Sequence, residues 1–465
     1  MRRAIELGTI MIIGAMAIGC AGAAPSITPE LPPPVRPDTI PPLARAKFDQ
    51  GLAAMAQHDA ANDWTAATCL ETAQLFAAAS DESGGSLPLS LYNAGLAHQR
   101  CKQHDQAKAQ FQAVLGRDPA FHRARVQVAL YLLADSGDRD LDRAIAELKR
   151  AAIDSQFKNV EAMSNLAMLQ MRRRGATADD DGPSDFERAK KNIQRTLAID
   201  DSHMPAYNLL ALYHLENAKR GAPGADGRAS KDRKKANSQA LELAALVCSQ
   251  AVRKSPHYAP IHNTSGLVQV ELGDLSGAVS DFQRARSLDP SFFEAHMNFA
   301  AVNLQFRGFK QAEEAYRAAL RMRPNDYDVH LGLALALRGQ LGAGGDEARA
   351  KEAKLELDRA KGIAPNRPEA YYNEAILTQE YNAKSSDSSE PALRTARSLF
   401  TVFVDKAGKA EAFKDTVVRA HARIDEIDQI LIFIKQTKEE QERSKREQLQ
   451  RDAEQTVAGE GEPEH

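Results

Sequence analysis

The chain is 465 residues long, with 26% charged, 43% hydrophobic and only 6% aromatic residues, and its formal net charge is −3. This composition agrees with a soluble, helical body. The nearly neutral balance provides no global field that would favour nucleic acid or an anionic surface. No apolar run after the N-terminal one is long enough to span a bilayer.

The N-terminus has the pattern of a secretory signal. Two arginines precede an apolar run at 10–18, which ends just before Cys20 and is too short for a stable membrane span. The ending of this run resembles a bacterial lipobox. That resemblance implies that the signal peptide, 1–19, is removed and that Cys20 is acylated. Ala21, at the next position, implies sorting to the outer membrane.

The segment 20–42 is expected to be a tether that begins at the lipidated cysteine. Eight of the eighteen residues from Pro25 to Pro42 are proline. Such a stretch favours an extended polyproline conformation of about 3.1 Å per residue, hence a semi-rigid reach of roughly 55 Å. An unstructured leader is the alternative, with the same reach and less stiffness. Either would hold the following residues away from the bilayer.

From 43 to 408 the chain resembles itself at an offset of 34 residues, most clearly between 259–292 and 293–326. The equivalent pairs are Gly266 and Ala300, Ala278 and Ala312, Phe282 and Tyr316, Ala285 and Ala319, and Pro290 and Pro324. This pattern resembles the tetratricopeptide repeat (TPR) family, in which small residues let two helices approach and an aromatic fills the space between them. The proline is expected to end each second helix, because it has no N–H to donate.

The same register extends in both directions and predicts an all-α TPR solenoid of about nine helix–turn–helix units. The nine ranges are 44–79, 88–121, 122–158, 160–203, 204–258, 259–292, 293–326, 327–367 and 368–407. Such units stack into binding surfaces and seldom perform chemistry themselves. The resemblance therefore implies a binding protein, with no enzymatic activity.

Four units contain insertions, at 173–186, 218–238, 339–350 and 383–391. Each insertion falls between the first and second helix of its unit, so we expect four flexible loops along one edge of the stack. The second insertion is basic and the first contains three consecutive aspartates. Solvated loops without a partner are the simpler interpretation of both.

After the last unit, an apolar seam predicts a long helix over 409–455. The seam residues are Phe413, Val417, Ala420, Ile424, Ile427, Leu431 and Ile434. Steps of four and three give a coiled-coil-like stripe that needs a partner. We expect the helix to cap the last unit, with dimerisation or docking on another protein as the alternative. The final segment, 456–465, is expected to be a disordered acidic tail.

Three cysteines lie within the repeats. Cys248 occupies an apolar position and is expected in the core. Cys69 and Cys101 lie on helices that should run antiparallel and meet near these residues, so a disulfide is available in an oxidising compartment. Two separate buried thiols are the alternative, because the sequence does not show whether the sulfurs face each other.

Neither a cofactor nor a metal site is expected. His262, His296 and His330 recur at intervals of 34 residues, but rungs of stacked units lie about 10 Å apart, too far for one ion. Packing against the preceding helix is the simpler role. The sequence contains no phosphate-cradling loop, nucleophile elbow or metalloprotease helix motif.

Asparagine recurs on the first helices, which line the binding face of a TPR stack. The candidate groove residues are Asn93, Asn165, Asn208, Asn263, Asn298 and Asn373. An asparagine amide both donates and accepts, so a row of them can pair with the backbone of an extended peptide. A simple preference for asparagine at this place in the repeat is the alternative. Gln127 and Gly332 interrupt the row and suggest two shorter grooves.

The complete layout resembles the TPR lipoproteins of the myxobacterial gliding-motility (Glt-type) envelope complex. This resemblance implies a scaffold anchored in the outer membrane, facing the periplasm, with envelope proteins as partners. Two alternatives are a pilotin-like assembly factor for a secretin or pilus channel, and a regulatory subunit of an envelope polysaccharide export system. Neither nucleic acid nor a small-molecule substrate is expected.

Overall fold

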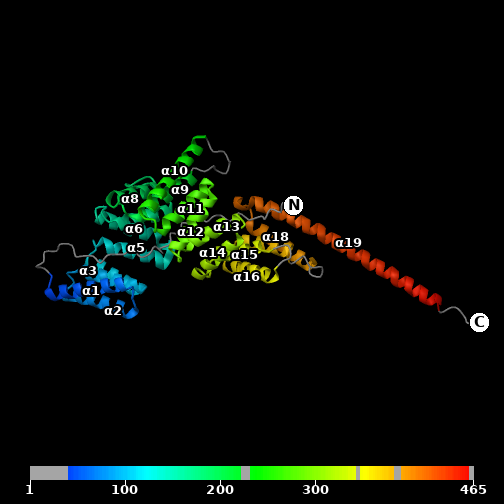
Figure 1. The fold of residues 1–465 in the computed structure, drawn as a ribbon, viewed down its shortest axis with the longest axis horizontal. Helices are drawn as coiled ribbons and strands as arrows, with labels where there is room; N and C mark the ends of the chain where they lie inside the picture. The colour runs from blue at the N-terminus through cyan, green and yellow to red at the C-terminus, as the bar shows by residue number, and fades with distance from the viewer. Residues whose placement is uncertain (1–39, 221–230, 342–345, 382–388, 460–465) are drawn as a thin grey trace, which may run out of the picture. The chain divides into compact units, whose positions relative to one another are not determined.

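A computed structural model describes residues 40–220, 231–341, 346–381 and 389–459. These residues form nineteen α-helices and no strand, which confirms the all-α prediction. The chain divides into two compact bodies, with the boundary between Asp289 and Pro290. The N-terminal body contains α1 to α12 and the C-terminal body contains α13 to α19 (Figure 1). The predicted signal peptide, Cys20 and most of the tether lie outside the described residues.

The N-terminal body consists of six helical hairpins, whose two helices pack against each other. The helices are α1 (Pro42–Ala61), α2 (Ala66–Glu82), α3 (Pro88–Arg100), α4 (His104–Arg117), α5 (His122–Ser136), α6 (Leu141–Asp154), α7 (Val160–Arg173), α8 (Asp185–Ile199), α9 (Met204–Arg220), α10 (Lys231–Lys254), α11 (Ala259–Leu272) and α12 (Leu275–Leu288). A short 3-10 turn, η2 (Gly137–Asp140), follows α5.

The C-terminal body adds three hairpins and a long last helix. The helices are α13 (Phe293–Gln305), α14 (Phe309–Met322), α15 (Tyr327–Gly339), α16 (Glu347–Ile363), α17 (Glu369–Glu380), α18 (Ser389–Ala407) and, after the short turn η4 (Glu411–Phe413), α19 (Lys414–Gly459). The prediction of nine units is confirmed, because each range predicted from the repeat contains one hairpin.

The 34-residue pattern has a direct packing cause. Phe282 on α12 is fully buried and lies against Gly266 on α11, where an added Cβ would come within 2.6 Å of the ring. Phe111 on α4 lies against Gly95 on α3 in the same way. A missing side chain on the first helix thus makes room for the aromatic ring of the second, and interiors packed this closely tolerate little added volume.

Three of the insertions that we expected to be flexible loops are described only in part, and the structure shows helix at some of their ends. The insertion at 218–238 is largely helical at its ends, because α9 continues to Arg220 and α10 begins at Lys231. Only 221–230 separates these helices and lies outside the described residues. Of the insertion at 339–350, the residues 342–345 lie outside the described residues, and α16 already begins at Glu347. Most of the insertion at 383–391 lies outside them, at 383–388.

The insertion at 173–186 is not the loosely solvated loop that we expected. Asp185, fully buried at the start of α8, accepts hydrogen bonds from the Arg173 and Arg188 guanidiniums and from the Gly175 backbone, each at 2.7 Å. Asp179 accepts a 2.9 Å hydrogen bond from Lys149 on α6. These bonds fasten both ends and the middle of the loop to flanking helices.

The prediction of a capping helix is confirmed. Ala420 and Ile427 of α19 are fully buried against Phe400 and Phe403 of α18, and the remaining seam residues pack against the same cluster. Arg397 and Asp428 form an ion pair across the two helices. Beyond Lys435 the described side chains of α19 are almost all exposed, and Figure 1 shows α19 extending past α18. The helix continues to Gly459, so the first part of the predicted tail is helical.

Candidate functional site

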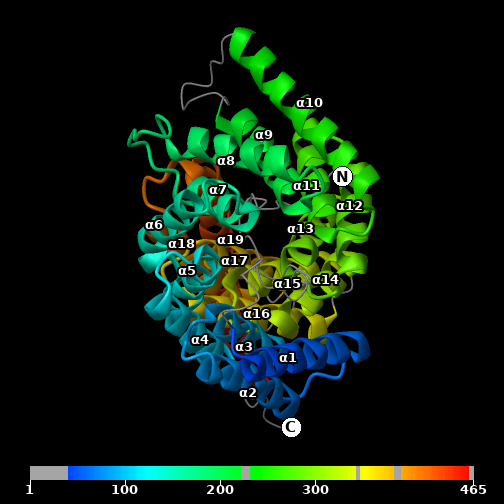
Figure 2. The same cartoon turned by 90° about the vertical axis from the view of Figure 1, so that its left-hand side faces the viewer.

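In the N-terminal body, the first helices of the third to sixth hairpins contact one another in succession. The contacts run from α5 to α7, from α7 to α9 and from α9 to α11. Figure 2 shows α7, α9 and α11 one after another. On α7, the partly exposed residues Glu161, Asn165 and Met168 and the exposed Arg172 recur at steps of four, three and four. Most other α7 side chains are buried. This stripe is therefore the free face of α7.

An apolar row runs across the free faces of these four helices. The row consists of the ninth residue of each repeat unit, Leu130, Met168, Leu212 and Leu267, which are all partly exposed. Met168 packs against the buried clusters on both sides of α7, and Leu212 against those on both sides of α9. Because equivalent positions of stacked units lie side by side, we name Leu130, Met168, Leu212 and Leu267 the inner strip.

Two asparagine amides flank the centre of the inner strip. The Asn165 side chain donates to the backbone carbonyl of Glu161 at 2.9 Å, and its Oδ1 has no partner among the described residues. Asn208 on α9 accepts a 2.6 Å hydrogen bond from Thr264, and its Nδ2 has no partner in the same part of the chain. An open acceptor and an open donor are the two groups that a peptide unit of an extended chain requires.

Ion pairs neutralise one edge of the inner strip, at the C-terminal ends of the first helices. Each pair joins consecutive hairpins: Arg172 with Asp138 at 2.6 Å, Arg174 with Glu216 at 2.9 Å, and Lys219 with Glu271 at 3.3 Å. At the other edge, burial raises the pKa of Glu161, with the Arg123 guanidinium opposing the rise. Burial also lowers the pKa of Arg123. The charged groups at these two edges thus lie opposite one another across the hairpins, and the surface between them is apolar and amide-bearing.

The predicted asparagines differ in their exposure. Asn165 and Asn208 are partly exposed at the inner strip. Asn93 is fully buried on α3. Asn373 is only 3% exposed, and its amide already accepts from Arg338 and donates to the Glu369 carbonyl. Asn263 and Asn298 are each 7% exposed.

Sequence reasoning missed the inner strip itself. Asparagine has a distinctive hydrogen-bonding chemistry, whereas leucine and methionine are also typical of an ordinary helical core. A signal was present in the sequence: in four successive units this position is a long, unbranched-at-Cβ apolar residue. Its partial exposure depends on how the units stack, which the repeat pattern alone does not specify.

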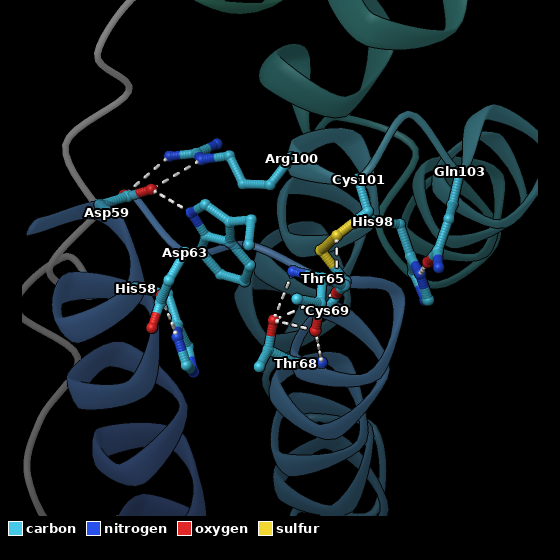
Figure 3. Close-up of a disulfide and its surroundings, with 11 residues drawn as sticks. His58, Asp59, Asp63, Thr65, Thr68, Cys69, His98, Arg100, Cys101 and Gln103 are labelled. Carbon is cyan, nitrogen blue, oxygen red and sulfur yellow. Dashed lines mark hydrogen bonds and ion pairs between the residues drawn. A yellow bond between two sulfur atoms is a disulfide. The ribbon is translucent and has the colours of Figure 1, made fainter. Parts of the chain in front are cut away.

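The structure joins Cys69 and Cys101 in a disulfide, with a Cα–Cα distance of 6.3 Å. Figure 3 shows the bond between α2 and the turn after α3. Thr65 caps α2 by accepting from the Thr68 backbone at 3.2 Å, and Arg100 donates to Asp59 at 3.1 Å. The disulfide thus fastens the first two hairpins together where their turns meet. Cys248 is buried, as predicted.

The histidines at intervals of 34 residues share one hydrogen bond. The Nε2 of His262, His296 and His330 lies 2.9–3.1 Å from the carbonyl of the proline six residues earlier. Each ring therefore ties the start of a first helix to the turn before it. Within the described residues, no group of three or more acidic, histidine or cysteine side chains is arranged to hold a metal ion. No described helix is long and apolar enough to cross a membrane.

Comparisons with known proteins agree on the repeat. Residues 89–121 match the tetratricopeptide repeat family. U-box domain-containing protein 70 of Oryza sativa subsp. japonica is 20% identical over 65% of this chain and 38% of its own length. The Hsp70-Hsp90 organizing protein of Triticum aestivum is 24% identical over 31% of this chain and 26% of its own length. The chain thus spans less than half of each of these relatives.

Among solved structures, Pseudomonas aeruginosa pilF is similar with 17% identity and a TM-score of 0.40, covering 56% of this chain and 97% of that one. The hairpins, their packing and the family match define the class of the molecule: an all-α protein built from stacked helical hairpins. The second hairpin is a tetratricopeptide repeat, and the other eight have the same two-helix form.

Proposed function

We propose that this protein is a scaffold that binds polypeptide segments of partner proteins along the inner strip. The observation that carries the proposal is the apolar row from Leu130 to Leu267 with the open amide groups of Asn165 and Asn208 beside it. Apolar side chains of a partner would pack on the row while its backbone pairs with the amides. Backbone pairing gives affinity, and side-chain pockets give specificity.

The site has no arrangement that favours chemistry over binding. The polar groups at the inner strip are amides and mutually paired charges, and we propose a non-enzymatic role. The printed name of the rice relative includes a U-box domain, but this chain spans only 38% of that protein. The activity of the whole relative therefore gives no reason to propose the same activity here.

We place the scaffold in the bacterial envelope, attached to the outer membrane through Cys20 and facing the periplasm, within a gliding-motility complex. The lipobox-like N-terminus and the layout of tether, repeats and terminal helix support this proposal. The Cys69–Cys101 disulfide supports it independently, because structural disulfides persist in oxidising compartments. Mass spectrometry of the mature protein tests the anchor: an unacylated Cys20 would exclude it.

The binding proposal is tested with paired variants in crosslinking and pull-down from intact envelopes. Met168→Glu and Leu212→Glu place charges on the inner strip and should reduce partner recovery at least about tenfold, a loss of roughly 1.4 kcal/mol. Ile199→Glu is the matched control, since Ile199 is 52% exposed on the second helix α8. Equal recovery by all three variants would reject the inner strip as the site.

The identity of the recovered partners tests the envelope assignment. Recovery of gliding-motility proteins would support the proposed complex. Recovery of a secretin or of polysaccharide-export components would replace it with one of the other envelope roles. Asn165→Ala and Asn208→Ala, made together, should weaken capture without loss of helicity. Circular dichroism checks the helicity.

A further inference from the structure

A buried arginine on the first-helix side of the C-terminal body forms no ion pair with any described residue. Arg338, near the end of α15, is only 7% exposed. Its Nη1 donates to Asn373 Oδ1 on α17 at 3.0 Å, a neutral acceptor. No carboxylate of the described residues lies within ion-pair distance of Arg338. Burying an unpaired charge is costly, so this residue requires an explanation.

The charged groups around Arg338 leave a surplus of positive charge. Glu380 is the nearby carboxylate, and it already pairs with Arg423 of α19 at 3.4 Å. Arg423 also donates to Gln379 at 3.2 Å. Burial lowers the pKa of Arg338, and Arg423 acts in the same direction, against Glu380 and two tyrosines. Two guanidiniums thus share one carboxylate.

We propose that Arg338, with Arg423 beside it, receives a carboxylate from an acidic segment of a bound partner polypeptide. A carboxylate is the planar anion that matches the paired N–H groups of a guanidinium, and it would supply the missing negative charge. The inference rests on the proposed scaffold function and adds the chemistry of the partner. In this proposal the inner strip of the N-terminal body binds apolar side chains and the backbone of a partner, and the Arg338 site binds its acidic side chains.

The small carboxylate alone tests the site without any peptide. In the full chain labelled with ¹⁵N-arginine, acetate should give a saturable shift of the Arg338 Nε–H resonance, and the Arg338→Lys variant identifies that resonance by its loss. No response to acetate would overturn the proposal. A tighter response to inorganic phosphate than to acetate would overturn the assignment of a carboxylate.

A peptide array tests the partner chemistry in the protein as it exists. Each peptide is presented in an Asp/Glu form and in a matched Asn/Gln form. The wild-type chain should favour the acidic forms by about tenfold, and Arg338→Gln should lose that preference. Arg317→Gln is the control, because Arg317 is already paired with Glu313 and Glu352 and should leave the preference intact.

The two proposals fail in different ways. Binding that is sensitive to Met168→Glu but shows no acidic preference would overturn the Arg338 inference and retain the scaffold function. An acetate response without any peptide binding would reject the scaffold function and retain the anion site. Arg338→Gln should also keep or raise the melting temperature, because an unpaired buried charge is removed. A lowered melting temperature together with a persisting acidic preference would show that Arg338 only supports the fold.

Discussion

At the scale of single residues, the repeat pattern identified the small and aromatic positions but not every reason for them. Gly332 looked like a gap in the asparagine row. In the structure it lies directly against the ring of Tyr316, and an added Cβ would overlap that ring. Its role is to accept the aromatic of the preceding hairpin. Packing between neighbouring hairpins, absent from a one-dimensional pattern, decided its identity.

The first residue-scale prediction concerns these close approaches. Gly266→Ala would place a Cβ within 2.6 Å of Phe282 and should destabilise the protein by about 1–3 kcal/mol. Gly362→Ala, on α16 with open space around it, should stabilise by up to about 1 kcal/mol. Urea unfolding followed by circular dichroism measures both. Equal midpoints for the two variants would contradict the packing account.

The second residue-scale prediction is a dependence on pH. Asp281, 3.8 Å from Nδ1 of His262, raises the pKa of that histidine against the lowering effect of burial. Because the pKa of His262 is higher in the folded than in the unfolded protein, the protonated ring stabilises the fold. This stabilisation is fully present below the unfolded-state pKa of ~6.5 and is lost as the pH rises through the folded-state pKa. The melting temperature of the wild type should therefore be higher than that of His262→Gln, and the difference should be larger at acidic than at alkaline pH. Asp281→Asn should flatten this dependence.

At the scale of elements, the sequence placed the helices well and described the connections poorly. The first-helix and second-helix ranges follow from periodicity, which is local. The loop at 173–186 looked solvated because its residues are polar. Asp185 is nevertheless fully buried, since two arginines from separate positions converge on it. Partners that meet only after folding give no local signal, so this loop required the structure.

The element-scale prediction concerns the same loop. Burial raises the pKa of Asp185, but hydrogen bonds from Arg173 and Arg188 outweigh it and lower the pKa, so the group is ionised and paired. Asp185→Asn should cost about 3 kcal/mol, because it removes the fully buried carboxylate that Arg173 and Arg188 share and leaves them only their pairs with Asp142 and Asp179. Limited trypsin digestion should then cut the loop near Arg174. Asp180→Asn, at an exposed neighbouring position, is the control and should remain resistant.

At the scale of the whole molecule, α19 closes the end of the last hairpin. The predicted seam is buried against α18, and the polar continuation beyond Lys435 is exposed. A stack of hairpins needs a covered end to stay soluble. The described part of the chain thus assigns the cap to the first half of α19. The remainder of that helix contributes little to the core.

The whole-molecule prediction separates these two halves. Truncation after Lys435 should leave the melting temperature and the monodispersity of the protein unchanged. Truncation after Gly408 should lower stability by several kcal/mol, because each fully buried apolar side chain contributes about 1.5–3 kcal/mol, and should cause aggregation. Thermal melting and size-exclusion chromatography measure the difference. Aggregation of the protein truncated after Lys435 would show that the far half of α19 also covers apolar surface.

The sequence by itself determined the all-α class, the nine hairpins, the seam of the capping helix and the residues that let paired helices approach. These features depend on periodicity and on contacts within or between adjacent segments, which repeat in the chain. The tertiary structure decided which asparagines are open, that an apolar row lies beside them, and that Arg338 is buried with the neutral amide of Asn373 as its hydrogen-bond acceptor. Exposure and charge pairing depend on how successive hairpins stack, and the one-dimensional pattern does not record that geometry.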